Sequence, residues 1–246
     1  MTIKTLIEWA DSTLNTAWGC TKVSAGCQNC YMFELSKMFN KDPTKPNPRK
    51  AQNIIADLNK YKNSKIIFVN SMTDTYHENF DFDLISSWFD IFISRPEQEF
   101  LILTKRINRA YNFHKKYQVP ENCWIGTSIE NKSALHRLEK LKRIKAKIRY
   151  VSFEPLLEDL GEINLNGIQW AIVGGESSRV LEPRPMKEVW AINIKNQCRK
   201  SKTAFFFKQM GGRIKHESGT WGSPYLQGEK YLEMPICLST KTSVQK

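Results

Sequence analysis

Residues 99–128, EFLILTKRINRAYNFHKKYQVPENCWIGTS, carry the pattern that decides the fold. An apolar run, EFLILT, is followed by a stretch in which apolar residues recur at helical spacing, and a second apolar run, CWIGTS, comes after it. Short, nearly continuous apolar runs separated by helices are typical of parallel strands covered on both faces. This stretch therefore predicts a βαβ unit.

The same alternation extends over most of the chain. It predicts further strands at 65–70, 148–153, 170–175 and 204–209, and further helices at 82–94, 133–147 and 187–201. A short first strand is expected near residues 6–9 or 16–18, which brings the count to about seven. Seven parallel strands favour an α/β fold of the full or partial (β/α) TIM-barrel type over a Rossmann sheet.

We expect one domain over residues 1–246, with a barrel at 9–210, a cysteine loop at 18–31 and a C-terminal hairpin and tail at 211–246. The hairpin is expected to turn at Gln227 and Gly228. No apolar run approaches the ~18 residues of a membrane helix, and the N-terminus lacks the apolar segment of a secretory signal. The expected compartment is therefore the cytoplasm, with no membrane partner.

Polar residues follow nearly every predicted strand. The carboxyl ends of parallel strands lie together at one face of an α/β fold. The polar residues that follow the strands therefore predict an active or binding site at that face. The expected catalytic residues are Lys105, Arg106 and Glu154. The expected cofactor-binding residues are Ser128, Glu130, Gly174, Gly175, Glu176 and Ser177.

Each of these residues also has a structural interpretation. Lys105 and Arg106 could hold a carboxylate or phosphate, or could begin a basic surface. Glu154 could accept hydrogen bonds from a substrate, or could pair with an arginine (Arg149 or Arg184). The glycine pair at 174–175 could admit a ligand close to the backbone, or could form a tight turn. The sequence favours a solvated loop for Asp74 and His77 over acid–base chemistry.

Three of the six cysteines, Cys20, Cys27 and Cys30, lie within eleven residues in a C-x6-C-x2-C arrangement. Thiolates favour zinc, Cu(I) or iron–sulfur clusters. A structural zinc site normally has four protein ligands, and no fourth Cys or His is near in sequence. Three thiolates suit a [4Fe–4S] cluster with one open iron, which could bind S-adenosylmethionine (SAM) and cleave it to a deoxyadenosyl radical. Zinc with a remote histidine, or no metal, are the alternatives.

The other three cysteines, Cys123, Cys198 and Cys237, lie among apolar neighbours and are expected to be buried hydrophobes. The net charge is +12, and residues 101–150 hold 13 Lys/Arg against 3 Asp/Glu. This basic region favours DNA or RNA as a partner. The alternative is a solvated helix over 133–147, with Leu135, Leu138, Leu141 and Ile144 on its buried face.

Several stretches, among them WGCTKVSAGCQNCY, IFVNSMTDTYHE, GTSIEN, VSFEPLL, IVGGES and FFFKQMGG, together resemble the phage Gp37/Gp68 family, a three-cysteine family of unknown function. The resemblance implies a radical SAM-like partial TIM barrel with Cys20, Cys27 and Cys30 as cluster ligands. It also implies a phage or prophage setting and a three-Cys-motif partner protein. One departure is Ser178, where many relatives have glycine.

Two functions follow as hypotheses. The first is an iron–sulfur radical SAM enzyme that acts on nucleic acid or nucleotides, in modification or repair. The second is a non-enzymatic nucleic-acid-binding module, stabilised by zinc or a cluster, that works with a partner protein. Analysis of iron, sulfide and zinc distinguishes them.

Overall fold

The computed structural model describes every residue except 1–4, 6, 39–41, 179–180 and 236–246. Cys237 lies outside the described residues. Contacts divide the chain into two compact units. The first unit comprises Met1–Ser128 and His136–Lys147, and the second comprises Ile129–Leu135 and Ile148–Lys246. That the chain forms a single domain stays a prediction.

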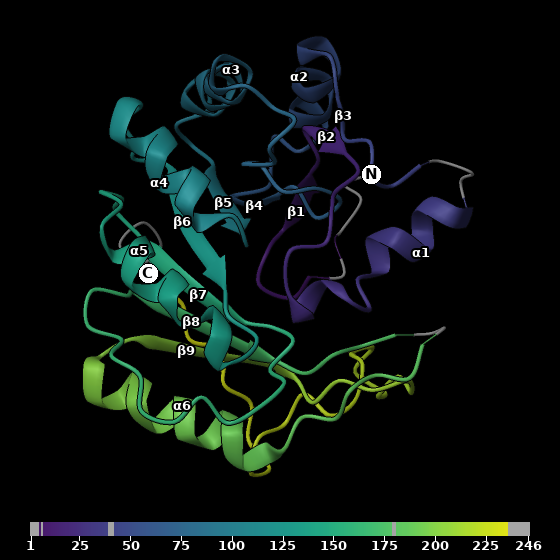
Figure 1. The fold of residues 1–246 in the computed structure, drawn as a ribbon, viewed down its shortest axis with the longest axis vertical. Helices are drawn as coiled ribbons and strands as arrows, with labels where there is room; N and C mark the ends of the chain where they lie inside the picture. Colours follow the sequence, from purple (N-terminus) through teal and green to yellow (C-terminus); the bar gives the residue numbers. More distant parts are fainter. Residues whose placement is uncertain (1–4, 6, 39–41, 179–180, 236–246) are drawn as a thin grey trace, which may run out of the picture. The chain divides into compact units, whose positions relative to one another are not determined.

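The first unit contains four parallel strands in chain order, with helices between them (Figure 1). The strands are β1 (Ser12–Leu14), β4 (Ile66–Val69), β5 (Glu99–Thr104) and β6 (Cys123–Ser128). The helices are α1 (Tyr31–Met38), α2 (Ala51–Lys60), α3 (Phe82–Ile93), α4 (Ile107–Lys116) and α5 (His136–Lys142). Two very short strands, β2 (Ala17–Trp18) and β3 (Asn47–Pro48), pair antiparallel.

The second unit contains three parallel strands in chain order, β7 (Arg149–Phe153), β8 (Trp170–Gly174) and β9 (Ala204–Gln209). Its helix α6 (Glu188–Ser201) lies along β8 and β9 (Figure 1). Near the C-terminus a tight turn joins Leu226 to Glu229 by backbone hydrogen bonds of 2.9 and 3.1 Å. Both turn residues, Gln227 and Gly228, have positive φ, as a two-residue hairpin turn requires.

Among the described residues the two units together supply seven parallel strands, and helices join all successive strands except β7 and β8, which confirms the predicted α/β fold of the partial (β/α) barrel type. Three predicted strands, at 99–104, 123–128 and 204–209, coincide with β5, β6 and β9. Their apolar side chains are almost all buried, which is why continuous apolar runs in the sequence located them. No helix among the described residues is long and apolar enough to cross a membrane.

Neither predicted position, 6–9 or 16–18, is the first strand of the parallel sheet, and the second overlaps β2, which pairs antiparallel with β3. That first strand is β1, and it pairs with β4 so that Ser12 lies opposite Ile67. The Asp11 carboxylate accepts hydrogen bonds from the backbone N–H groups of Lys65 and Ile66, at 2.8 and 2.9 Å. This side-chain contact sets the register of a strand that has a single large apolar residue, Leu14, and hence no apolar run to recognise.

The basic helix is shorter than predicted. Instead of one helix over 133–147, a 3-10 turn at Lys132–Ala134 precedes α5, which ends at Lys142. Bonds of the i to i−3 type close the next turn, at Arg143 and Ile144. Like charges three and four residues apart destabilise a helix, and this segment is rich in them. Helices α1 and α2 were not predicted.

Helix α4 carries a partly buried histidine. The His114 Nδ1 lies 3.0 Å from the carbonyl of Tyr117 and its Nε2 lies 2.7 Å from the Tyr76 hydroxyl. Nδ1 therefore donates to the carbonyl, and in the neutral ring Nε2 accepts from the hydroxyl. Burial lowers the pKa of His114 to about 4.

Acidification should therefore destabilise the protein through His114. Between pH 6.5 and 4 the unfolded imidazole binds a proton that the folded one does not, so unfolding becomes easier as pH falls. We expect a loss on the order of 3 kcal/mol across that window. Urea titrations at several pH values measure it. The loss in free energy of unfolding should shrink in His114→Gln and persist in His136→Gln, a control at an exposed histidine. An equal loss in wild type and both variants would contradict the assignment to His114.

Candidate functional site

The three loop cysteines lie in one segment, which begins where β2 ends. Gly19 has a φ of +100°, and a Cβ there would meet the Pro43 carbonyl oxygen at 3.0 Å, so a side chain would be strained and crowded. Its N–H donates to the Met72 carbonyl at 3.1 Å, and the Cys20 N–H donates to Pro43 at 2.7 Å. The start of the loop is thus tied to the segment that follows β4.

The rest of the loop leads into α1. Cys27 ends a 3-10 turn at Ala25–Cys27, and Cys30 directly precedes the first residue of α1. All five cysteines that the structure describes are free thiols. Burial raises the pKa of the Cys20 thiol to about 11 and also raises that of Cys30. Cys123 and Cys198 are fully buried, as predicted.

Asp74, in the loop after β4, organises the polar residues beside Cys20. Its carboxylate lies 2.7 and 2.9 Å from the Thr104 hydroxyl at the end of β5, which donates to it. It also accepts from the backbone N–H groups of Tyr76 and Lys105, both at 3.0 Å. One carboxylate thus joins the ends of β4 and β5.

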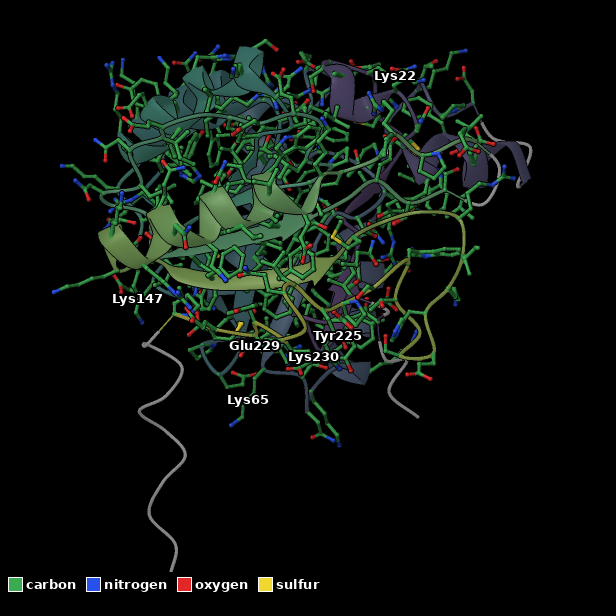
Figure 2. All side chains as sticks on the ribbon, turned by 90° about the horizontal axis from the view of Figure 1, so that it is seen from below. Lys22, Lys65, Lys147, Tyr225, Glu229 and Lys230 are labelled. Atoms are coloured by element: carbon green, nitrogen blue, oxygen red, sulfur yellow. The ribbon has the colours of Figure 1, made fainter. Side chains whose placement is uncertain are left out.

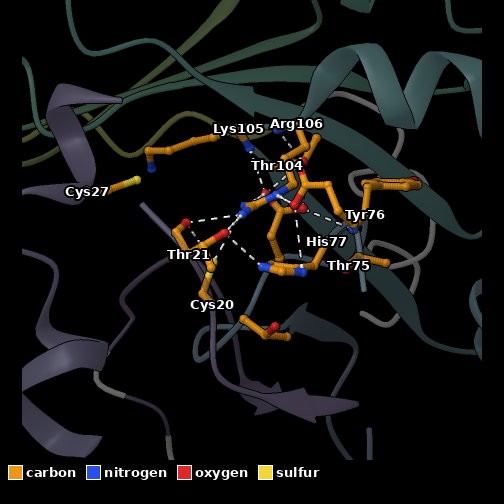
Figure 3. Close-up of polar contacts among 12 residues, drawn as sticks. Cys20, Thr21, Cys27, Thr75, Tyr76, His77, Thr104, Lys105 and Arg106 are labelled. Atoms are coloured by element: carbon orange, nitrogen blue, oxygen red, sulfur yellow. Dashed lines mark hydrogen bonds and ion pairs between the residues drawn. The ribbon is translucent and has the colours of Figure 1, made fainter. Parts of the chain in front are cut away.

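Arg106 is the centre of this network, which we call the Arg106 cluster: Cys20, Thr21, Asp74, His77, Glu78, Thr104 and Arg106 (Figure 3). Its Nε donates to Glu78 at 2.8 Å, and Nη1 lies 3.4 Å from Asp74. Nη1 also lies 3.5 Å from the Cys20 sulfur, and Nη2 donates to the carbonyl and hydroxyl of Thr21 at 3.1 and 2.7 Å. The neighbouring carboxylates raise the Arg106 pKa, so the guanidinium stays charged.

His77 completes the cluster as a neutral ring. Its Nδ1 accepts from the Asn79 backbone N–H at 3.2 Å, so the proton is on Nε2, which donates to the Thr21 hydroxyl at 3.0 Å. Burial, and then the Arg106 charge, lower the pKa of His77. The ring therefore positions Thr21 and carries no charge.

Lys105 approaches a different part of the cysteine loop from Arg106. Its side chain extends toward Cys27 (Figure 3). Its charge also opposes the burial effect on the pKa of Cys30. Two cations, from adjacent residues at the end of β5, thus lie beside the cysteine loop.

The structure corrects two expectations here. Asp74 and His77 are not on a solvated loop, because their exposed fractions are 6% and 1%. Arg106, with 7% exposure and two acidic partners, is not the beginning of a basic surface. The partners that bury these residues come from distant positions in the chain. The catalytic roles expected for Lys105, Arg106 and Glu154 stay predictions.

The second unit holds a different polar cluster. Glu154, after β7, pairs with Lys208 of β9 at 3.0 Å and accepts from the Ser152 hydroxyl at 2.9 Å. Lys208, and neither Arg149 nor Arg184, is thus its partner. The pair is partly exposed, with side-chain exposures of 24% for Lys208 and 16% for Glu154, and offers an ammonium and a carboxylate to a ligand.

The glycine pair at the end of β8 makes room for this chain's own atoms. A Cβ on Gly174 would lie 2.6 Å from the Glu154 carboxylate, and one on Gly175 would lie 1.9 Å from the Met210 carbonyl oxygen. Close packing of the chain against itself, and not a tight turn, therefore accounts for both glycines.

Glu176 is buried and already paired. Arg184 donates to it from the backbone N–H and from Nε, both at 2.9 Å, and from Nη2. Ser177 accepts from the Gln209 amide at 2.6 Å. The hydrogen bonds and charge of Glu176, and to a smaller extent the charge of the fully buried Glu130, raise the pKa of Arg184. Ser128, in the first unit, is buried at the end of β6, where its carbonyl accepts from Arg137 at 2.8 Å.

Several site residues were not singled out from the sequence: Thr21, Glu78 and Lys208. Lys208 had a detectable signal, because it stands near the end of a predicted strand as the chosen residues do. Thr21 and Glu78 have none, since only long-range contacts distinguish them from surface residues. Arg184 was considered as a partner of Glu154, and it pairs with Glu176 instead.

The described residues contain no group of three His, Cys, Asp or Glu side chains arranged to hold a metal ion. The three thiols nevertheless supply the soft donors that an iron–sulfur cluster takes, Lys105 supplies positive charge beside the thiolates, and Arg106 supplies an N–H group near the Cys20 sulfur. The donor chemistry fits a cluster, and the sulfurs would have to converge to hold it.

Two solved structures of spore photoproduct lyase are similar to the chain. A single-site mutant gives 12% identity and a TM-score of 0.47, with 82% of this chain and 64% of that chain covered. A double mutant with bound AdoMet and dinucleoside spore photoproduct gives 13% identity and a TM-score of 0.42, with 78% and 62% covered. The chain thus spans less than two thirds of the length of each.

No curated protein matches the sequence. The resemblance to the phage Gp37/Gp68 family stays a prediction. A family described as "Protein of unknown function (DUF5131)" matches residues 4–235, and the chain therefore belongs to the DUF5131 family.

Proposed function

We propose that the chain is an iron–sulfur enzyme of the radical SAM type, in which Cys20, Cys27 and Cys30 hold a [4Fe–4S] cluster. The observation that carries this proposal is one loop with three free thiols, tied at its start to the loop after β4 and flanked by Lys105 and Arg106. Buried thiolates need nearby positive charge or hydrogen-bond donors, and adjacent residues at the end of β5 supply both: the Lys105 ammonium and the Arg106 N–H groups.

A cluster with an open iron supplies, when bound, a site for SAM and the electron that cleaves it. The protein's own contribution is to hold the loop. Arg106 and His77 fix Thr21, while Gly19 and Cys20 are bonded to the backbone at Met72 and Pro43. Cys27 and Cys30 lie on the part of the loop that would have to close around the cluster.

The metal content tests the ligand assignment. Cys20→Ala, Cys27→Ala and Cys30→Ala should each lose the iron and sulfide of the anaerobically reconstituted protein, whereas Cys123→Ala and Cys198→Ala should keep about four irons per chain. A loop variant with full iron content would remove that residue from the ligand set. One zinc per chain and no iron would favour the non-enzymatic, zinc-stabilised module instead.

Cleavage of SAM tests the reaction class. The reduced, reconstituted protein should convert SAM slowly to 5′-deoxyadenosine and methionine without added substrate, because the open iron needs no third component. Chromatography of the products measures the rate, and Cys27→Ala should abolish it while Cys123→Ala does not. A complete cluster that forms no product and whose EPR signal ignores SAM would refute the radical SAM assignment.

We further propose nucleic acid as the substrate class, bound at a basic surface of α4 and α5. These helices are in contact, and the Tyr111 ring of α4 has Lys140 at 4.7 Å and Lys115 at 5.9 Å from its centroid. Lys116, Arg143, Lys145 and Lys147 are exposed nearby in the chain. Exposed lysines also occur elsewhere, as at Lys22, Lys65 and Lys230 (Figure 2), so the surface needs a matched control.

Replacing Lys115, Lys140 and Arg143 by Gln should weaken binding to DNA or RNA oligonucleotides and reduce the slope of log K against log salt by about 2 to 3 units. The control replaces Lys60, Lys62 and Lys65, which removes the same charge from another exposed part of the first unit. Fluorescence anisotropy measures both. Equal losses in the two triple variants would assign the attraction to net charge alone. The three-Cys-motif partner, the phage setting and the cytoplasmic location stay predictions.

A further inference from the structure

Arg106 makes a contact that a purely structural ion pair does not need. Its carboxylate partners, Asp74 and Glu78, already neutralise the guanidinium, and Thr21 occupies Nη2. Nη1 is nevertheless shared between Asp74 and the Cys20 sulfur, at 3.4 and 3.5 Å. The arginine therefore directs an N–H group at a sulfur that the proposed function makes a cluster ligand.

The position of that N–H is fixed from several sides. Arg106 follows β5 directly, and its backbone N–H donates to the Thr104 hydroxyl at 2.8 Å. The planar guanidinium is then held by Glu78 at one end and by Thr21 at the other. A guanidinium held in this way loses little conformational entropy when it donates a hydrogen bond. A flexible lysine side chain would lose more.

We infer that Arg106 is a positioning residue for the cluster: its Nη1–H donates to the Cys20 thiolate, keeps Cys20 in place and raises the reduction potential. This inference rests on the proposed function. Hydrogen bonds to cluster sulfurs stabilise the more negative, reduced form, and they are among the factors that set the potential of an iron–sulfur protein. Without Arg106, the carboxylates of Asp74 and Glu78 would stand beside the cluster uncompensated.

The test is an EPR-monitored titration of the one-electron reduction of the reconstituted protein, with dithionite as reductant. In Arg106→Gln the ratio of reduced to oxidised cluster at a fixed solution potential should fall about tenfold, which is about 59 mV for a one-electron couple. In Arg106→Lys the same ratio should fall at least threefold, because lysine keeps the positive charge but lacks the planar guanidinium. The control Lys62→Gln removes one exposed cation of the first unit outside the cysteine loop and should change the ratio less than twofold.

The outcomes separate the inference from the proposed function. A wild-type protein that binds no iron overturns both. A wild-type protein with a full cluster, together with Arg106 variants whose ratios lie within twofold of wild type, overturns the inference and leaves the cluster standing. Circular dichroism and iron content check that each variant folds and is loaded. Should Arg106→Gln fail to fold, Arg106→Lys decides alone, and a ratio less than threefold below wild type overturns the inference.

Discussion

The first unit depends on one buried ion pair, that of Arg106 with Asp74. Burying two charges costs several kcal/mol per ion unless further hydrogen bonds satisfy them. Here the carboxylate also accepts from one hydroxyl and two backbone N–H groups, and the guanidinium also donates to Glu78 and Thr21. With its bonds satisfied, the pair connects the ends of β4 and β5 to the cysteine loop, so that all three segments keep one arrangement.

This network explains why chemistry-bearing residues gather at strand ends. The strands bury their apolar residues, and the interior of β4 and β5 carries no charged side chain. At the carboxyl end, the next residues turn away from the sheet and can reach side chains of the neighbouring connection. Thr104 and Arg106 at the end of β5 do this toward Asp74 after β4. The same principle operates in the second unit, where Glu154 after β7 meets Lys208 near the end of β9.

The two clusters use charge differently. In the Arg106 cluster the ion pairs hold a loop, and the buried donors and acceptors are directed at one another. In the second unit, Glu176 and Arg184 form a pair of that kind, whereas Glu154 and Lys208 keep part of their surface open. Glycines serve the packing of this chain: Gly175 admits the Met210 carbonyl and Gly174 admits the Glu154 side chain.

The sequence by itself determined the α/β class, the six longer strands and the three-cysteine loop, because burial on both faces demands continuous apolar runs and soft metal donors are rare enough to notice. It did not locate β1, whose register comes from the Asp11 carboxylate, nor the early end of α5. It also placed Asp74 and His77 in solvent. Only the tertiary structure decided their burial, because the partner that makes a buried charge tolerable, Arg106, lies about thirty residues away and is recognisable only when β4 and β5 are adjacent.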